Sequence, residues 1–180
     1  MLSWRLHYRG MILSEAYLDS EEALEERRAE WRHRLQHDMH DENMFCLLAT
    51  LLHEGRTIVG FVCMFVREGY KQFVAAEYVN QERAESAEMV ALLQRAAYID
   101  NLHVHIDYQG RGIGGQLMYK ASQAAHGRPL FLSVYALNTK AMDFYVRKMK
   151  GEVTTKYAIE TKTNDGSVKD TFNVLWKNGL

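Results

Sequence analysis

The sequence predicts an α/β domain built on a mixed β-sheet, and three observations support this class. A strand–helix–strand order over 97–135 implies a parallel pair, because two strands joined by a packed helix run in the same direction. Two apolar runs over 44–66, separated by a short polar turn, indicate an antiparallel pair. Two further runs over 153–176 flank Asn164-Asp165-Gly166, which is typical of a hairpin turn. A sheet with both kinds of pairing, flanked by helices, is therefore expected.

The N-terminal part predicts two helices. The segment 21–36 follows Ser20 and opens with acidic residues, which is a helix start signal. Large side chains recur there with helical spacing, at Leu24, Arg28, Trp31 and Leu35. A shorter helix is expected before it, over roughly 3–17.

Strands are expected over 44–53 and 57–66, where the apolar runs are short enough for buried strands. The segment 67–97 gives no clear element: "YKQFVAAEYV" fits a strand in part, and "ERAESAEMVALLQRA" fits a helix or a loop. Unassigned segments of this length in a compact domain are often functional loops.

The C-terminal half is clearer. A strand is expected over 97–106 and a helix over 112–125, which Gly127 and Pro129 end. A strand over 129–137 follows. Asn138 is a candidate N-cap for a helix over 139–150, which Gly151 ends. The runs "VTTKYAIE" and "TFNVLW" predict the last two strands.

Composition restricts the function class. The 180 residues fit a single domain over 1–180, and the net charge of −1 gives no basic field for nucleic acid or an acidic membrane. No apolar run reaches the roughly 18–20 residues of a membrane span, and the N-terminus lacks a secretory signal. Cys46 and Cys63 each lie in an apolar run and are interpreted as two separate core thiols. A cytoplasmic protein is expected.

The stretch Tyr108–Gly115, "YQGRGIGG", carries four glycines between a strand and a helix. A glycine-rich turn that leads into a helix exposes N–H groups at the positive end of the helix dipole. Such a terminus binds phosphate, so the expected ligand is an anion, in particular a diphosphate, with Arg111 adding positive charge.

Two known nucleotide-binding motifs match this stretch only in part. A P-loop needs Lys and then Ser or Thr after its last glycine, whereas Gly115 and Gln116 follow Gly114. The glycines at 110, 112 and 115 fit the dinucleotide fingerprint, but no acidic residue ends the next strand. A nucleotide-dependent oxidoreductase therefore stays a lesser alternative.

The stretch "NLHVHIDYQGRGIGGQLM" resembles the central motif of the GNAT superfamily of acyl-CoA N-acyltransferases, through Gln109, Gly112 and Gly114. The downstream "ALNTKAMDFYVRKMKGE" is similar to the second signature of that family, with matches at Asn138, Ala141, Phe144, Tyr145 and Gly151. The resemblance implies a splayed central sheet flanked by helices. The family fold usually begins with a strand, whereas this sequence begins at the first expected helix. Either the edge strand is lacking, or another chain supplies it, as in a homodimer.

The resemblance also implies a site for acetyl-CoA. Its pyrophosphate would lie on the N–H groups of Gln109, Gly110, Arg111, Gly112, Ile113, Gly114 and Gly115, and the second signature adds Asn138 and Ala141. Its pantetheine arm would pair with the strand at Leu102, His103 and Val104, and the Val104 N–H would polarise the thioester carbonyl. Tyr145 would protonate the leaving thiolate.

The acceptor implied is an amine, on a small molecule or a peptide, with its identity open. Strand alternation places Asp100 on the face of Leu102 and Val104, which makes it a candidate general base; His103 and Glu77 are the other options. A non-catalytic acyl-CoA sensor is the alternative from another class. No metal site is expected from His103 and His105, or from His33, His37 and His40, because no further ligands lie at suitable spacing.

Overall fold

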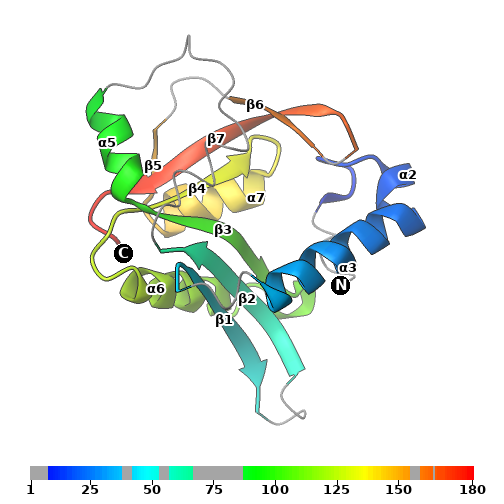
Figure 1. The fold of residues 1–180 in the computed structure, drawn as a ribbon, viewed down its shortest axis with the longest axis horizontal. Helices are drawn as coiled ribbons and strands as arrows, with labels where there is room; N and C mark the ends of the chain where they lie inside the picture. Colours follow the sequence, from blue (N-terminus) through cyan, green and yellow to red (C-terminus); the bar gives the residue numbers. More distant parts are fainter. Residues whose placement is uncertain (1–7, 38–41, 53–56, 67–86, 155–158, 164) are drawn as a thin grey trace.

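The computed structural model describes residues 8–37, 42–52, 57–66, 87–154, 159–163 and 165–180 (Figure 1). The elements in chain order are α2 (Glu15–Leu18), α3 (Glu21–Gln36), β1 (Met44–Leu51), β2 (Thr57–Phe65), α5 (Ala87–Arg95), β3 (Ala97–Val104), η3 (Ile106–Tyr108), α6 (Ile113–Ala124), β4 (Leu130–Tyr135), α7 (Thr139–Met142), the π-helix η4 (Asp143–Lys148), β5 (Glu152–Val153), β6 (Ile159–Lys162) and β7 (Val168–Trp176).

The strands form one mixed sheet in the order β1-β2-β3-β4-β7-β5, with β6 also paired to β7. Among the strands that the structure describes, β3 and β4 alone pair in parallel, and the other pairs are antiparallel. The parallel pair is short, because its register covers Ala97 with Leu130 and Tyr98 with Phe131 alone. Beyond these pairs the two strands diverge (Figure 1). The mixed, splayed sheet predicted from the sequence is confirmed.

A β-bulge in β3 lies just after the parallel pair. Ile99 pairs with Met64 of β2 and Asn101 pairs with Cys63, so Asp100 is the extra residue. Before the bulge, the Ala97 N–H faces β4 and donates to the Pro129 oxygen over 2.8 Å. After the bulge, the His105 N–H faces β2 and donates to the Val59 oxygen at 2.8 Å. Odd-numbered residues of β3 therefore point their N–H groups toward β4 before the bulge and toward β2 after it.

Helices cover both faces of the sheet. On one face, α6 contributes Leu117, Met118 and Ala121 to a core that includes Leu132 of β4 and Val174 of β7. On the other face, Leu93 in the last turn of α5 packs with Phe131 of β4 and Leu175 of β7. These two residues are next to Leu132 and Val174 in their strands and so point to the opposite face. The α3 helix covers that second face over β2, where the rings of Trp31 and Phe61 meet edge to face at 5.0 Å.

In the described residues, the helix predicted over 3–17 is confirmed at Tyr8 and in α2 from Glu15, and it is wrong over 9–14. Residues 8–12 form a turn in which the N–H groups of Met11 and Ile12 both donate to the Tyr8 oxygen, and α2 alone follows. Gly10 has a φ of 71°, a left-handed conformation that a right-handed helix cannot contain. Residues 1–7, and with them the question of a strand before α2, lie outside the described residues.

Three further expectations need refinement. The helix expected over 139–150 is the short α7 followed by η4, with Asn138 as the N-cap that accepts from the Ala141 N–H at 3.1 Å. The strand expected over "VTTKYAIE" falls on β5 and β6, with 155–158 outside the described residues. Of the unassigned segment 67–97, α5 and the start of β3 are described, and 67–86 lies outside.

Cys46 and Cys63 are not separate thiols. They pair directly across β1 and β2, and their sulfur atoms lie 2.7 Å apart. The hydrogen bond to Cys46 and burial raise the pKa of Cys63. Among the described helices, none has the length and apolar character to cross a membrane.

Candidate functional site

The glycine-rich turn leads into α6 with its backbone exposed. Gly110 and Gly112 have φ values of 75° and 81°, a left-handed conformation that favours glycine. Gly112 is the N-cap of α6 and supplies no side-chain hydrogen bond. The first helical bond of this terminus runs from the Gln116 N–H to the Gly112 oxygen, at 3.1 Å. The N–H groups before Gln116 therefore have no acceptor within the helix and are available to an anion.

Side chains hold this turn in place from within. The Gln109 amide donates to the Val104 oxygen at 3.1 Å, which ties the turn to the end of β3. The Arg111 guanidinium donates to the Asp107 oxygen at 3.0 Å and lies over the Tyr108 ring at 5.0 Å. Arg111 thus lies folded on the turn, where its charge still adds to the positive end of α6.

Gly114 lets η4 approach the start of α6. A Cβ atom at this position would lie 3.3 Å from the ring of Phe144, closer than most carbon contacts. The two sequence signatures therefore meet in space, because Gly114 belongs to the first and Phe144 to the second.

The splay exposes one edge of β3 beside this turn. Because the bulge inverts the alternation, the N–H groups of Leu102 and Val104 face away from β2, toward the gap left by β4. The amide of His103 faces β2, and its ring lies 5.8 Å from that of Phe61 on the α3 face. Of the three strand residues expected at the site, Leu102 and Val104 therefore present their N–H groups to the splay, and His103 does not.

Tyr145 lies at the inner end of this gap, within the core cluster that contains Ile99 and Val134. Its side chain is buried, at 9% exposure, and packs edge to face against Trp176 with ring centroids 6.2 Å apart. Burial raises the pKa of the Tyr145 phenol, and the nearby Tyr8 raises it further. The phenol is therefore neutral near pH 7 and keeps a proton that it can donate.

Asp100 does not share a face with Leu102 and Val104, which corrects the expectation from simple alternation. Its carboxylate accepts from the Arg34 guanidinium of α3 and from the Asn101 amide, the latter at 2.6 Å. Leu102 and Val104 pack with the core on the α6 face instead. The reason is the bulge, which turns Asp100 and Asn101 toward the same helix.

The ion pair of Asp100 belongs to a wider network. Arg34 also pairs with Glu30 at 3.0 Å, and its guanidinium lies 5.5 Å from the ring centre of Trp31. The side chains of Arg34 and Asp100 are only 16% and 19% exposed. This network attaches α3 to the bulge, and no pattern in the sequence indicates that these positions pair.

Tyr8 is a second residue that sequence reasoning missed. Its ring lies 6.1 Å from that of Tyr135, at the end of β4. Burial raises the pKa of Tyr8, while the charges of Arg27, Glu30 and Asp100 also act on it, and Tyr8 in turn acts on Tyr145. Tyr8 therefore lies between the α3 network and the gap between β3 and β4.

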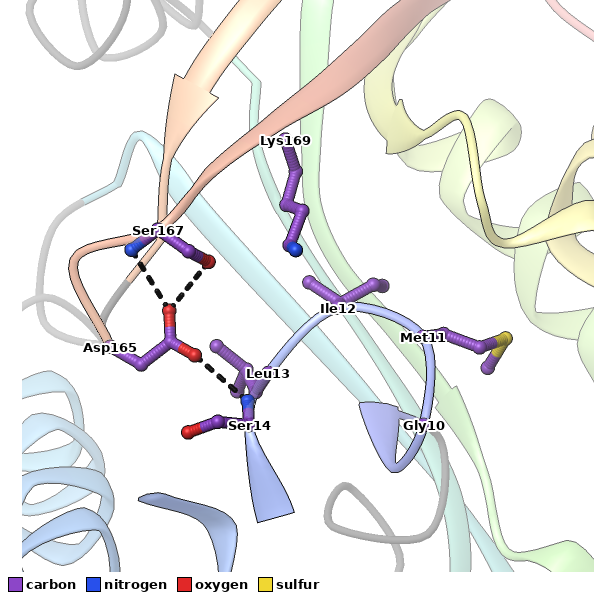
Figure 2. Close-up of a pocket in the computed structure, with 8 residues that line it drawn as sticks. All are labelled: Gly10, Met11, Ile12, Leu13, Ser14, Asp165, Ser167 and Lys169. Atoms are coloured by element: carbon purple, nitrogen blue, oxygen red, sulfur yellow. Dashed lines mark hydrogen bonds between the residues drawn. The ribbon is translucent and has the colours of Figure 1, made fainter. Parts of the chain in front are cut away.

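A cavity of about 280 Å³ lies between residues 10–14 and the turn from β6 to β7 (Figure 2). Asp165 joins its two walls, because its Oδ2 accepts from the Ser14 N–H at 2.8 Å. Its Oδ1 accepts from the Ser167 N–H, the Ser167 hydroxyl and the Thr163 hydroxyl, at 3.1, 2.7 and 2.6 Å. These hydrogen bonds lower the pKa of Asp165.

The histidines considered as metal ligands are not clustered. His103 lies against Phe61, whereas His105 accepts from the Asp107 N–H at 3.4 Å. The rings of His33 and His37 lie 4.8 Å apart, and His40 is outside the described residues. In the part of the chain that the structure describes, no three His, Cys, Asp or Glu side chains group as a metal would require.

Comparison with known proteins agrees with this geometry. Residues 11–150 match the model of the Acetyltransferase (GNAT) family. The PaiA N-acetyltransferase of Thermoplasma acidophilum, solved with coenzyme A, superposes with a TM-score of 0.59 at 17% identity, over 97% of this chain and 86% of that one. Arabidopsis thaliana NAA60, solved with a bisubstrate analogue, gives 0.54 at 19% identity over 83% and 91%.

The ribosomal-protein-S18-alanine N-acetyltransferase of Escherichia coli gives a TM-score of 0.51 at 18% identity, over 82% of this chain and 77% of that one. At these identities the likeness concerns the fold. No curated protein matches the sequence.

Proposed function

The chain belongs to the GNAT acetyltransferase family, and from this we propose that it is an N-acetyltransferase that transfers the acetyl group of acetyl-CoA to a primary amine by direct attack in a ternary complex. The observation that carries this proposal is the meeting of two unsatisfied backbone surfaces. One is the N-terminus of α6, and the other is the edge of β3 that β4 leaves unpaired. The first suits a diphosphate and the second suits a peptide-like chain.

The residues of the turn fit the donor substrate. The backbone N–H groups of 110–115 would hold the pyrophosphate, whereas the Gln109 N–H is already donated to the Ile106 oxygen at 3.3 Å. The left-handed Gly110 and Gly112 keep this backbone free of side chains. Asn138 and Ala141 would act indirectly, since the Asn138 side chain is already bonded to the Ala141 N–H and so orders the start of α7. Acetyl-CoA supplies an activated thioester when it is bound.

The chain's own groups would then perform three tasks. The Leu102 and Val104 backbone would align the pantetheine arm, and the Val104 N–H would donate to the thioester carbonyl oxygen, where negative charge develops. The amine nitrogen bonds to the carbonyl carbon as the carbon–sulfur bond breaks. Holding both reactants in one groove would increase the rate of this step through proximity. Tyr145 would give its proton to the leaving sulfur.

The amine must lose a proton, and the sequence makes Asp100 the first candidate for the base. The ion pair with Arg34 favours a structural role instead, because a base role requires Arg34 to release the carboxylate. His103 faces α3, and Glu77 lies outside the described residues. We propose a base role for Asp100, directly or through water, only for a state in which that ion pair opens.

Calorimetry and thiol release test the proposal together. Acetyl-CoA should bind with micromolar affinity and stabilise the protein against heating, whereas NAD(H) should not. Free thiol should then form in the presence of a suitable amine. Binding without thiol release across a broad amine panel would favour a non-catalytic acyl-CoA sensor. Stabilisation by NAD(H) alone would favour the oxidoreductase alternative.

A further inference from the structure

The cavity of Figure 2 lies close to the C-terminal end of β4, although no β3 or β4 residue lines it. Lys169, which lines it, is on β7 two residues before Thr171, and Thr171 pairs with Tyr135 at the end of β4. The Ala136 N–H donates to the Asp170 oxygen at 2.8 Å, which holds this part of β7 beside the end of β4. The cavity is therefore next to the strand end where the splay is widest.

The opposite wall of the cavity leads back to the proposed proton donor. Residues 10–14 lie just after Tyr8 in the chain. The backbone carbonyl oxygen of Tyr8 accepts from the Met11 and Ile12 N–H groups at 3.2 and 3.1 Å. The Tyr8 ring packs against Tyr135, and its phenol acts electrostatically on Tyr145. Tyr8 does not itself line the cavity, and these contacts connect the cavity wall to Tyr145 through Tyr8.

Among its described lining residues the cavity has one cation, Lys169, and one carboxylate, Asp165. The Lys169 ammonium points into the space toward Ile12 (Figure 2), and no described residue forms an ion pair or hydrogen bond with it. Asp165 keeps its negative charge but forms no ion pair with Lys169, because both of its oxygens accept from neutral donors in the clasp between Ser14 and the β6–β7 turn. The other wall residues, which include Met11 and Leu13, are uncharged.

We propose that this cavity is a subsite for the acceptor, in which the Lys169 ammonium binds a carboxylate. The acceptor is then an amine that carries a carboxylate some distance from its amino group, such as a short peptide or an amino acid with an amine in its side chain. A polyamine fits poorly, because its second ammonium would meet that of Lys169. The inference rests on the proposed acetyl transfer and names the substrate class for it.

The test compares acceptors that differ only in the carboxylate. Dipeptides and tripeptides with a free or an amidated C-terminus, and a linear diamine, are offered to the wild type with saturating acetyl-CoA, and thiol release is followed. We expect kcat/KM to favour the free carboxylate by about tenfold, the value of one charge-assisted hydrogen bond. In Lys169→Met this preference should fall to about one, mainly through KM.

Lys120→Met is the matched control, because Lys120 is exposed on α6 and bonds only to Gln123 at 3.0 Å among the described residues. It should keep the full preference. Lys169→Glu should reverse the preference toward the amide and the diamine. Unchanged calorimetry with acetyl-CoA would show that each variant is folded and that its donor site is intact.

A wild type that prefers the diamine, or shows no preference for the carboxylate, overturns the inference while leaving acetyl transfer in place. A preference that persists in both Lys169 variants overturns it as well. If acetyl-CoA fails to bind, or if no amine at all releases thiol, the proposed function fails and the inference falls with it.

Discussion

The two sides of the splay are built in different ways. The donor side, which we define as the β3 edge at Leu102 and Val104 with the turn at 109–115, consists of backbone groups from one continuous segment. Its bracing contact joins Gln109 to Val104, five residues apart. The acceptor side, which we define as residues 8–14, α3 and the β6–β7 turn, consists of side chains. Its contacts join residues that are far apart in the sequence. Arg34 pairs with Asp100, 66 residues away, and Ser14 is bound by Asp165, 151 residues away.

This difference implies two kinds of sensitivity. A site made of backbone N–H groups depends on conformation, so that most substitutions leave it intact and only a change of φ or of the bulge disturbs it. A site made of side chains depends on residue identity, so that one substitution changes its charge. The donor side should therefore tolerate change except at its glycines, whereas the acceptor side can change its substrate with single substitutions.

The largest effect is expected at Tyr145, where the two sides meet. Tyr145→Phe removes the proposed proton donor and leaves the packing against Trp176 in place, so kcat should fall about a hundredfold. The affinity for acetyl-CoA, measured by calorimetry, should change by less than about twofold, since the phenol acts on the departing sulfur rather than on binding.

Tyr119→Phe is the control for this change, because Tyr119 is 52% exposed on α6. It should leave kcat unaltered. If Tyr145→Phe turns over at the wild-type rate, Tyr145 is a packing residue and the proton reaches the sulfur by another route.

Arg34→Met should have the next largest effect, because it tests whether the acceptor side supports the donor side. The change leaves the Asp100 carboxylate without its partner in a poorly solvated place, at a cost of about 2–3 kcal/mol, less than for a fully buried pair. The bulge would then lose its anchor on α3, and kcat should fall about tenfold as the Val104 amide shifts. Urea unfolding and steady-state kinetics measure the two effects.

Arg32→Met serves as the control on the same helix, since Arg32 is 59% exposed and its pair with Glu25 should contribute little. The double variant Arg34→Met with Asp100→Leu should recover part of the lost stability, because an apolar pair can replace a buried ion pair. If the double variant also recovers kcat, Asp100 acts by position. If its kcat is lower than that of Arg34→Met, the carboxylate takes part in proton removal.

Gly112→Ala tests the donor side by conformation alone. A φ of 81° is unfavourable for alanine by about 1–2 kcal/mol, and relaxing it would turn N–H groups of the turn away from the diphosphate. The affinity for acetyl-CoA should fall about tenfold. Gly127→Ala provides a close match, because Gly127 has a φ of 76° and, like Gly112, open space where a Cβ would lie. It should lose similar stability and keep its affinity; equal loss of affinity in both variants would point to a global effect.

The same contrast explains what could be predicted from the sequence. The mixed sheet, the turn into α6 and the N-cap at Asn138 follow from short-range patterns of glycine, apolar runs and capping, whereas the splay followed from the family resemblance, and these predictions are confirmed. The face of Asp100 was predicted wrongly because a bulge is set by pairing with a strand far away in the sequence. Tyr8, Arg34 and Asp165 were missed for the same reason, since each acts through a partner that only the folded chain brings near.

The smallest effect is expected at Asp165, which clasps the two walls of the acceptor side. Asp165→Asn weakens the hydrogen bonds that hold Ser14, Thr163 and Ser167, so the Tm should fall by about 2–4 °C at pH 7. The pKa of Asp165 is lowered by folding, so its contribution is complete above the unfolded pKa of about 3.9 and is lost as the pH falls toward the folded value. The Tm difference between wild type and variant should therefore shrink below about pH 4. Asp170→Asn, at an exposed position of β7, is the control and should change the Tm at pH 7 by less than about 1 °C. A difference that stays constant from pH 7 to pH 3 would mean that the clasp depends on the shape of the side chain and not on its charge.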